Sequence, residues 1–423
     1  YLDRLKEIAK NLDSKDELSI YRDKFILPKN QIYLDGNSLG VLAKDVVENV
    51  NYTIKEEWGN NLISSWNKSW IKLPRIISRK IASIIKSNED EVYVGSSTSI
   101  NLFKLLKSIL EANRDIKNIT TDNLNFPSDK YICEVIAKDF KIDFKFLDYG
   151  NDLKPDIEKL KEYISERKGI VVLSHVSFKS SFRYSVEDIS KFCKDNNIIV
   201  IWDLSHSVGA IDIDMRSNGI DYAIGCTYKY LNGGPGSPAF IYVRESKLRK
   251  LKSPIKGWFS HNKPFEYSNE YIESNSIEKF SNGTPHILSL STLKSSLDIT
   301  IEATTEKLGI KSADLFDFFL LIYNDELKKL DFDLLSPLEK DKRGSHISIS
   351  HKEAWRISKC LIDPVDKEAL RIIVDFRPKN IIRIALTPLY TSFEDIYLVC
   401  ERIIKIIRER EYSQKDNSMD GVT

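Results

Sequence analysis

The sequence predicts an α/β protein with a mostly parallel sheet covered by helices, together with a smaller α+β domain. Its 423 residues exceed the roughly 100–200 of an ordinary single domain. From about residue 88 to 245, short apolar runs rich in β-branched residues alternate with amphipathic stretches of helical length. Continuous apolar strands separated by such helices are typical of parallel sheets buried on both faces. From residue 309 onward, helices and strands follow in a mixed order instead.

The individual elements can be placed in chain order. Strands of the sheet are expected at 91–95, 118–121, 143–147, 169–174, 198–203, 222–226 and 239–243. The helices between them are expected at 99–112, 128–139, 156–167 and 185–196, the last opened by a Ser-x-x-Asp cap. The C-terminal part is expected to contain strands at 345–350, 370–376 and 381–385, then a helix from 392 to about 411.

These elements predict a division of the chain into four parts. Residues 1–50 form an N-terminal helix and segment that pack with the small domain, and 51–300 form the large α/β domain. Residues 301–412 form the C-terminal small α+β domain, and 413–423 form a flexible polar tail.

Composition excludes several classes of function. The 63 Lys+Arg balance 62 Asp+Glu, so no overall field or basic arm attracts nucleic acid. The longest apolar runs are strand-sized, so no membrane span is expected. The charged start YLDRLKEIAK predicts no secretory signal, and its missing initiator Met suggests trimming or processing. Five scattered cysteines without CxxC spacing predict a reducing, cytoplasmic location, and no histidine shows metal-ligand spacing.

Reactive side chains follow two successive strands. Asp203 and His206 come directly after one apolar strand, and Tyr228 and Lys229 come directly after the next. Ligands of parallel sheets bind at the strand carboxyl ends, so these side chains are expected to meet. A lysine and an acid are what pyridoxal phosphate (PLP) needs, one for a Schiff base and the other to keep its pyridine nitrogen protonated. The stretch GSSTS at 95–99 ends a strand and opens a helix, which favours binding of a phosphate.

Each of these features has a common structural explanation when it is taken alone. An aspartate after a strand is usually a turn residue or helix cap, a lysine there is usually solvated, and Ser/Thr clusters before helices are usually N-caps. The order of all of them on successive strand ends is what favours a PLP site.

Motifs along nearly the whole chain resemble the kynureninase family, bacterial type, which has the PLP-dependent transferase fold type I. The matching motifs are YLDGNSLG (33–40), EEWGNNLISSW (56–66), SSTSINLFK (96–104), NFPSDKY (125–131), LSHVSFKS (173–180), WDLSHSVGA (202–210), YKYLNGGPGSPAF (228–240), GWFSH (257–261), NGTPHILSL (282–290) and RIALTPLYTSF (383–393). The resemblance implies a mostly parallel seven-stranded-type sheet. It also implies PLP-dependent hydrolysis of L-kynurenine, and possible hydrolysis of 3-hydroxy-L-kynurenine, to an anthranilate and L-alanine. This reaction belongs to tryptophan catabolism or NAD biosynthesis.

The resemblance also implies roles for particular residues. Lys229 would bind the cofactor aldehyde, Asp203 would pair with the pyridine nitrogen with support from His206, and Tyr228 would be an acid or base catalyst. The full set expected to contact the cofactor is Thr98, Ser99, Phe126, Pro127, Ser128, Asp129, Ser174, Asp203, His206, Tyr228, Lys229, Trp258 and Thr284. Arg383 would clamp the substrate α-carboxylate, and Asn37 would also bind substrate.

Trp258 and Thr284 resemble positions that reach the cofactor of a neighbouring subunit, which implies a homodimer with its active site at the interface. Two alternatives remain open. A related PLP lyase or transaminase is one, such as a cysteine desulfurase that would use Cys360 or Cys400 as a loop nucleophile. A non-catalytic protein of the same fold is the other, although such a protein would be expected to lack Lys229 or Arg383.

Overall fold

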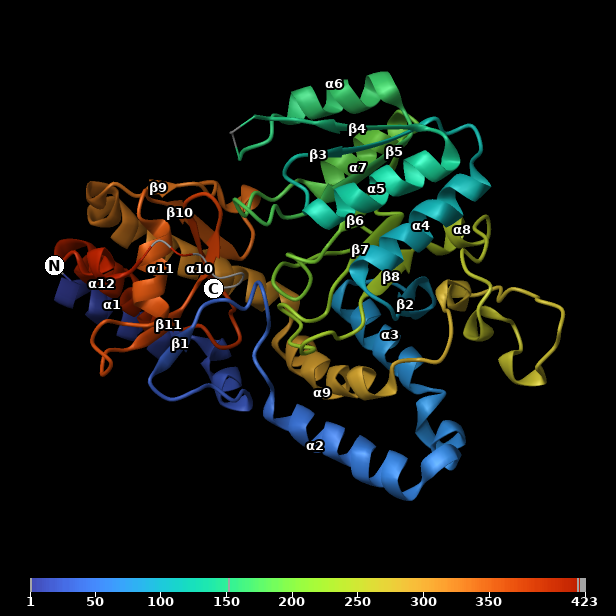
Figure 1. The fold of residues 1–423 in the computed structure, drawn as a ribbon, viewed down its shortest axis with the longest axis horizontal. Coiled ribbons are helices and arrows are strands. Elements are labelled where there is room, and N and C mark those ends of the chain that lie inside the picture. Colours follow the sequence, from blue (N-terminus) through green and yellow to red (C-terminus); the bar gives the residue numbers. More distant parts are fainter. Residues whose placement is uncertain (1, 151–152, 417, 419–423) are drawn as a thin grey trace.

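The chain folds around a seven-stranded sheet in the computed structural model, which describes residues 2–150, 153–416 and 418 (Figure 1). In spatial order the strands are β2 (Val92–Val94), β8 (Phe240–Val243), β7 (Tyr222–Gly225), β6 (Ile199–Asp203), β5 (Ile170–Ser174), β3 (Asn118–Asp122) and β4 (Asp143–Leu147). Strand β8 runs antiparallel to both of its neighbours, and the other pairs are parallel. The mostly parallel α/β architecture is therefore confirmed.

Helices cover both faces of this sheet because successive strand residues point to opposite sides. In β5, Ile170 and Val172 pack into the core beneath α4 (Thr98–Ala112) and α5 (Pro127–Phe140). Val171 and Leu173 pack into a second core on the other face. The helices of that face are α3 (Leu73–Ile84), α6 (Ile157–Arg167), α7 (Val186–Asp195) and α9 (Ile287–Ala303). The short α8 (Glu245–Leu248) follows β8.

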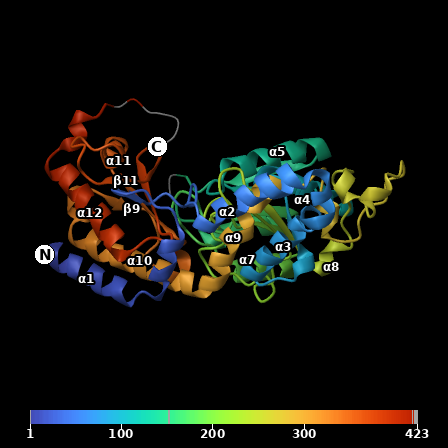
Figure 2. The ribbon, with the colours of Figure 1, turned by 90° about the horizontal axis from the view of Figure 1, so that it is seen from below.

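A second part of the molecule contains α1 and α12, the first and last α-helices of the described chain, as Figure 2 shows. Its helices are α1 (Leu2–Lys15), α10 (Thr305–Asp325), α11 (Ala354–Ile362) and α12 (Phe393–Arg408). They enclose an antiparallel sheet in the order β12 (Asp375–Arg377), β13 (Ile381–Ala385), β10 (His346–Ser350) and β9 (Asp333–Leu334). Leu5 and Ile32 from the N-terminal segment are buried in the same core as α12.

The expected strand at 370–376 is wrong as a single element. It divides at Val374 into β11 (Arg371–Ile373), which pairs in parallel with β1 (Gln31–Tyr33), and β12, which pairs with β13. The division follows from two separate partners, one of which lies near the N-terminus and could not be seen from the local pattern.

Helix α2 (Lys44–Tyr52) packs against α9, and short 3₁₀ and π turns fill residues 53–70. A 3₁₀ turn covers Glu411–Gln414, and residues 417 and 419–423 of the expected tail lie outside the described residues. Among the described helices, none is long and apolar enough to cross a membrane.

Candidate active site

The carboxyl ends of β6 and β7 border a cavity of about 850 Å³. Asp203 is the last residue of β6, and the loop after β7 carries Tyr228 and Lys229. Most residues around the cavity follow strand ends, and the rest lie between α8 and the first turn of α9. The lining residues are Ser96, Ser97, Thr98, Ser99, Ile100, Phe126, Ser128, Asp129, Asp203, Ser205, His206, Tyr228, Lys229, Gly236, Ser237, Pro238, Ala239, Ile255, Asn282, His286 and Ser289. The fold thus brings most of the expected cofactor residues to one place.

Lys229 projects into this cavity beside His206. Its Nζ lies 3.1 Å from Nε2 of His206 and 5.9 Å from the centre of the Phe126 ring. Burial, reinforced by the nearby charge of Lys229, lowers the pKa of His206 well below its ordinary value, so the imidazole is neutral. A neutral imidazole at this distance can form a hydrogen bond with Nζ of Lys229. The resemblance implies that His206 supports Asp203, and in the structure its Nε2 also lies within hydrogen-bond distance of Nζ of Lys229.

Two buried carboxylates, Asp129 and Asp203, face the same cavity. Burial and the neighbouring charge of Asp203 raise the pKa of Asp129 well above its ordinary value, because two close carboxylates resist being charged together. The backbone N–H and the hydroxyl of Ser205 both donate to Oδ1 of Asp203, at 2.9 and 2.6 Å. Ser205 therefore holds the carboxylate of Asp203 in place. Sequence reasoning overlooked Ser205, although it lies within the DLSH motif.

Hydroxyl groups surround the start of α4 at one wall of the cavity. Ser97 caps the helix by accepting a hydrogen bond from the N–H of Ile100 at 3.4 Å. Thr98 and Ser99 occupy the first helical turn and line the cavity. Free N–H groups and hydroxyls at the start of a 15-residue helix form a favourable environment for a phosphate.

The FPSD segment starts α5, which packs beside α4 on the same face of the sheet. Pro127 occupies the first helical turn, where its missing N–H costs no hydrogen bond, and Asp129 lies in the same turn. This start directs Phe126, Ser128 and Asp129 to the cavity. The Phe126 ring meets the Phe178 ring edge to face, with centroids 5.1 Å apart.

Arg383 lies in β13, at the side of the site formed by the second sheet. It is only 1% exposed, and its guanidinium has three partners. Nε donates to the carboxylate of Asp375, Nη1 donates to the carbonyl of Phe178 at 2.8 Å, and Nη2 donates to Oγ of Ser38 at 3.2 Å. Asn37, which precedes Ser38 in the sequence, is fully buried. Neither its side-chain oxygen nor its side-chain nitrogen has a hydrogen-bond partner. Buried amides without partners are unusual, which suits a residue awaiting a ligand.

Four residues expected to contact the cofactor lie outside the lining of the Lys229 cavity: Pro127, Ser174, Trp258 and Thr284. The hydroxyl of Ser174 donates to the amide oxygen of Asn125, one layer behind the cavity. Trp258 is 39% exposed and clusters with Phe259, Phe265 and Tyr267. Thr284 lines a neighbouring cavity of about 700 Å³ that shares its Ser96, Asn282 and His286 walls with the first.

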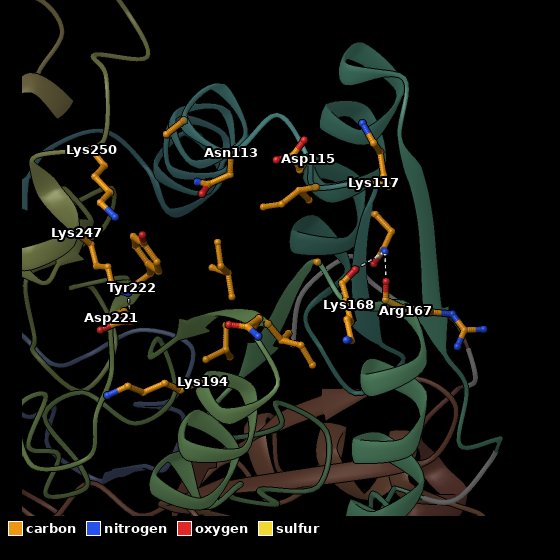
Figure 3. Close-up of a pocket in the computed structure, with 18 of the residues that line it drawn as sticks. Asn113, Asp115, Lys117, Arg167, Lys168, Lys194, Asp221, Tyr222, Lys247 and Lys250 are labelled. Carbon is orange, nitrogen blue, oxygen red and sulfur yellow. Dashed lines mark hydrogen bonds and ion pairs between the residues drawn. The ribbon is translucent and has the colours of Figure 1, made fainter.

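A further cavity of about 740 Å³ lies at the opposite edge of the sheet, where the strands begin (Figure 3). Basic side chains such as Lys168, Lys194 and Lys250 stand around its rim. Lys117 and Arg167 point away from its centre in Figure 3. Lys247 and Asp221 at this edge already pair with each other at 3.2 Å, and both side chains are partly exposed. Among the described residues, no group of three or more His, Cys, Asp or Glu could hold a metal ion.

The residues around Lys229 fit pyridoxal phosphate. An amine stands opposite two buried carboxylates, an aromatic ring borders the space, and a hydroxyl-rich helix start closes one end. Oδ2 of Asp129 is buried without a hydrogen-bond partner, which suits a carboxyl group that would bond to a polar atom of the cofactor. Fold and donor set together define a PLP-dependent enzyme of the aminotransferase class.

Comparisons with known proteins agree with this class. Residues 32–355 match the family described as aminotransferase class V, and residues 308–403 match the kynureninase C-terminal domain. Kynureninase from Pseudomonas fluorescens is 36% identical over 408 residues, which cover 95% of both chains. Kynureninase from Deinococcus radiodurans is 34% identical over 413 residues, covering 95% of this chain and 96% of the relative. The chain belongs to the kynureninase family.

Solved structures support the fold alone. A cysteine desulfurase from Thermococcus onnurineus NA1 has a TM-score of 0.77 at 18% identity, covering 92% of this chain and 98% of its own. A C-DES mutant with glycine covalently linked to the PLP cofactor has a TM-score of 0.77 at 16% identity, covering 90% and 98%. The two cysteines considered for desulfurase chemistry, Cys360 and Cys400, are fully buried in α11 and α12.

Proposed function

We propose that this protein hydrolyses L-kynurenine between Cβ and Cγ to anthranilate and L-alanine, with PLP as its cofactor. 3-Hydroxy-L-kynurenine is a second candidate substrate, which differs by one ring hydroxyl. The observation that carries the proposal is the single cavity in which Lys229 faces Asp129 and Asp203. Membership of the kynureninase family selects the reaction among those that such a cavity can support.

The cofactor would be held at three points. Lys229 would bind its aldehyde, and Asp203, steadied by Ser205, would hold its ring nitrogen with Asp129 close by. Thr98, Ser99 and Tyr228 would hold its phosphate, and Phe126 would cover its ring. When bound, PLP accepts the electron pair that is left on the substrate Cα when a bond to that carbon breaks.

The side chains supply the proton transfers. Nζ of Lys229 would take the proton from the substrate Cα, and Nε2 of His206 would orient Nζ. Burial raises the pKa of Tyr228 above its ordinary value, so its hydroxyl stays protonated and can donate to Cβ of the leaving alanine part. A water molecule would attack the γ-carbonyl to release the anthranilate acyl group.

Arg383 would bind the α-carboxylate of the substrate. Asp375 holds its Nε, and the two Nη atoms then present a flat edge suited to two parallel hydrogen bonds. A carboxylate at this edge would take the place of the Phe178 carbonyl and the Ser38 hydroxyl, so these partners must separate from Arg383 when substrate enters.

The direct test is the fluorescence of anthranilate formed from L-kynurenine by the PLP-loaded protein. Lys229→Ala is the control, and 3-hydroxy-L-kynurenine is assayed in parallel. Product that depends on Lys229 supports the reaction and the role of the lysine together. Absence of product from both substrates by a protein that carries PLP would refute the proposal.

We further propose a cytoplasmic homodimer in which Trp258 and Thr284 complete the partner's site. The exposed aromatic cluster around Trp258 and the position of Thr284 beside the shared wall support this arrangement. The five cysteines are free and buried, which suits a reducing compartment.

Light scattering measures whether the protein is a dimer in solution. Mixing inactive Lys229→Ala with inactive Trp258→Ala should restore about a quarter of native activity, because half of randomly formed dimers contain one intact site. A monomer, or a mixture without activity, would contradict it.

A further inference from the structure

Lys104, in α4, is a buried cation that the mechanism does not use. It is fully buried, and among the described residues no carboxylate lies within ion-pair distance of it. Burial lowers the pKa of its ammonium to about 7. Burying an amine in this way is unfavourable unless its contacts compensate for the lost water. Lys107, one turn further along the helix, shows the ordinary alternative: it pairs with Glu111 at 2.5 Å on the surface.

The contacts of Lys104 connect three segments, one of which is the turn before its own helix. Nζ donates to the carbonyl of Phe280 at 2.7 Å and to Oγ of Ser96 at 3.1 Å, and it lies 4.9 Å from the centre of the Tyr93 ring. Ser96 immediately precedes the N-cap of α4 and lines the Lys229 cavity. Lys104 therefore connects the Phe280 segment to the turn before α4 through hydrogen bonds from one buried amine.

Ser96 has an unusual backbone conformation. Its φ is +58°, in the left-handed region that favours glycine. Two side chains hold its hydroxyl, since Nδ2 of Asn282 also donates to Oγ at 3.1 Å, and the N–H of Ala239 donates to its carbonyl at 2.9 Å. Strained backbone of this kind persists where surrounding contacts enforce it, and such positions cluster at functional sites.

We infer that Lys104 is a positioning residue for the phosphate end of the cofactor site: by holding the hydroxyl of Ser96, it keeps the turn before α4 in the conformation that presents Thr98 and Ser99. The inference rests on the proposed PLP function. It makes Lys104 act through Ser96 rather than by touching the cofactor.

Substitutions at Ser96 test this while the side chain of Lys104 and its hydrogen bond to the Phe280 carbonyl are kept. Ser96→Ala keeps the strain of a side chain at positive φ and removes the hydroxyl, so the PLP dissociation constant of the full-length protein should rise about tenfold. Ser96→Gly also removes the hydroxyl but adopts positive φ freely, so it should stay within about twofold of the native protein. Equal losses in both variants would overturn the inference.

Lys104→Met should weaken PLP binding about as much as Ser96→Ala, with Lys107→Met as the matched control on the same helix. In the Ser96→Gly background, Lys104→Met should have little further effect, because the strained turn that it supports is gone. The ³¹P chemical shift of bound PLP should move in Lys104→Met and Ser96→Ala and remain native in Lys107→Met. An unchanged dissociation constant in Lys104→Met, or the same loss in both backgrounds, would overturn the inference. Native protein that fails to bind PLP would instead refute the proposed function.

Discussion

Asp375 and Arg383 lie directly opposite each other on β12 and β13, and Nε of Arg383 donates to the Asp375 carboxylate. Both residues are almost completely buried. The strand pairing fixes the backbones of both residues, so the orientation of the guanidinium is determined by the sheet as well as by the hydrogen bond. Asp375 is a residue of the site that no motif indicated.

Asp375→Asn should impair substrate binding more than the chemical steps. The amide keeps the shape but loses the charge that orients Arg383, so KM for L-kynurenine should rise about 10- to 100-fold with a smaller change in kcat. Steady-state kinetics measure this, and Asp333→Asn, an exposed substitution in the same sheet, is the control. A fall in kcat with unchanged KM would contradict the positioning role.

The contact between Lys229 and His206 predicts a graded effect of substitution. His206→Phe removes the acceptor while keeping a ring of similar size, so kcat should fall about 10- to 100-fold, as for loss of a hydrogen bond to a charged group. His206→Gln restores a polar partner and should lie between His206→Phe and the native protein. The absorbance of bound PLP must show equal loading in each case. Equal kcat in both variants would indicate that the contact does not orient Lys229.

Asp203→Asn tests the electron-sink assignment. If the negative charge of Asp203 keeps the cofactor ring protonated, kcat/KM should fall by at least about 10²-fold, as when other preorganised electrostatic groups are removed. The measurement is anthranilate release at known PLP occupancy. Near-normal turnover in a fully loaded Asp203→Asn protein would show that the assignment is wrong.

His175 makes a pH-dependent contribution to stability. Burial lowers its pKa from about 6.5 to about 3, with the charge of Arg183 acting in the same direction, so it stays neutral in the folded protein. The unfolded chain binds a proton below pH 6.5 and the folded one does not, so stability is lost as pH falls from 6.5 toward 3. His175→Gln removes this loss of about 1.4 kcal/mol per pH unit. Urea unfolding between pH 6.5 and 5 measures the difference in slope, and parallel slopes would contradict the prediction.

The local sequence determined much of the α/β part. Apolar β-branched runs end at Asp203 and shortly before Lys229, and the strand at 143–147 has the bounds expected for it. These features depend on neighbours within a few residues, which is why periodicity and turn residues were sufficient to predict them. The site motifs were visible for the same reason, because strand ends in a parallel sheet meet at one edge.

Contacts between segments far apart in the sequence determined how the small sheet is divided and which partners the buried side chains have. Val374 separates β11 from β12 because β11 pairs with β1 from the N-terminal segment. Asp375 orients Arg383, and Lys104 reaches Ser96 and Phe280, only after the chain has folded. A sequence shows which residues can be charged or can donate hydrogen bonds. Burial and pairing in three dimensions determine which of them meet, and therefore which partner each group has and how its pKa shifts.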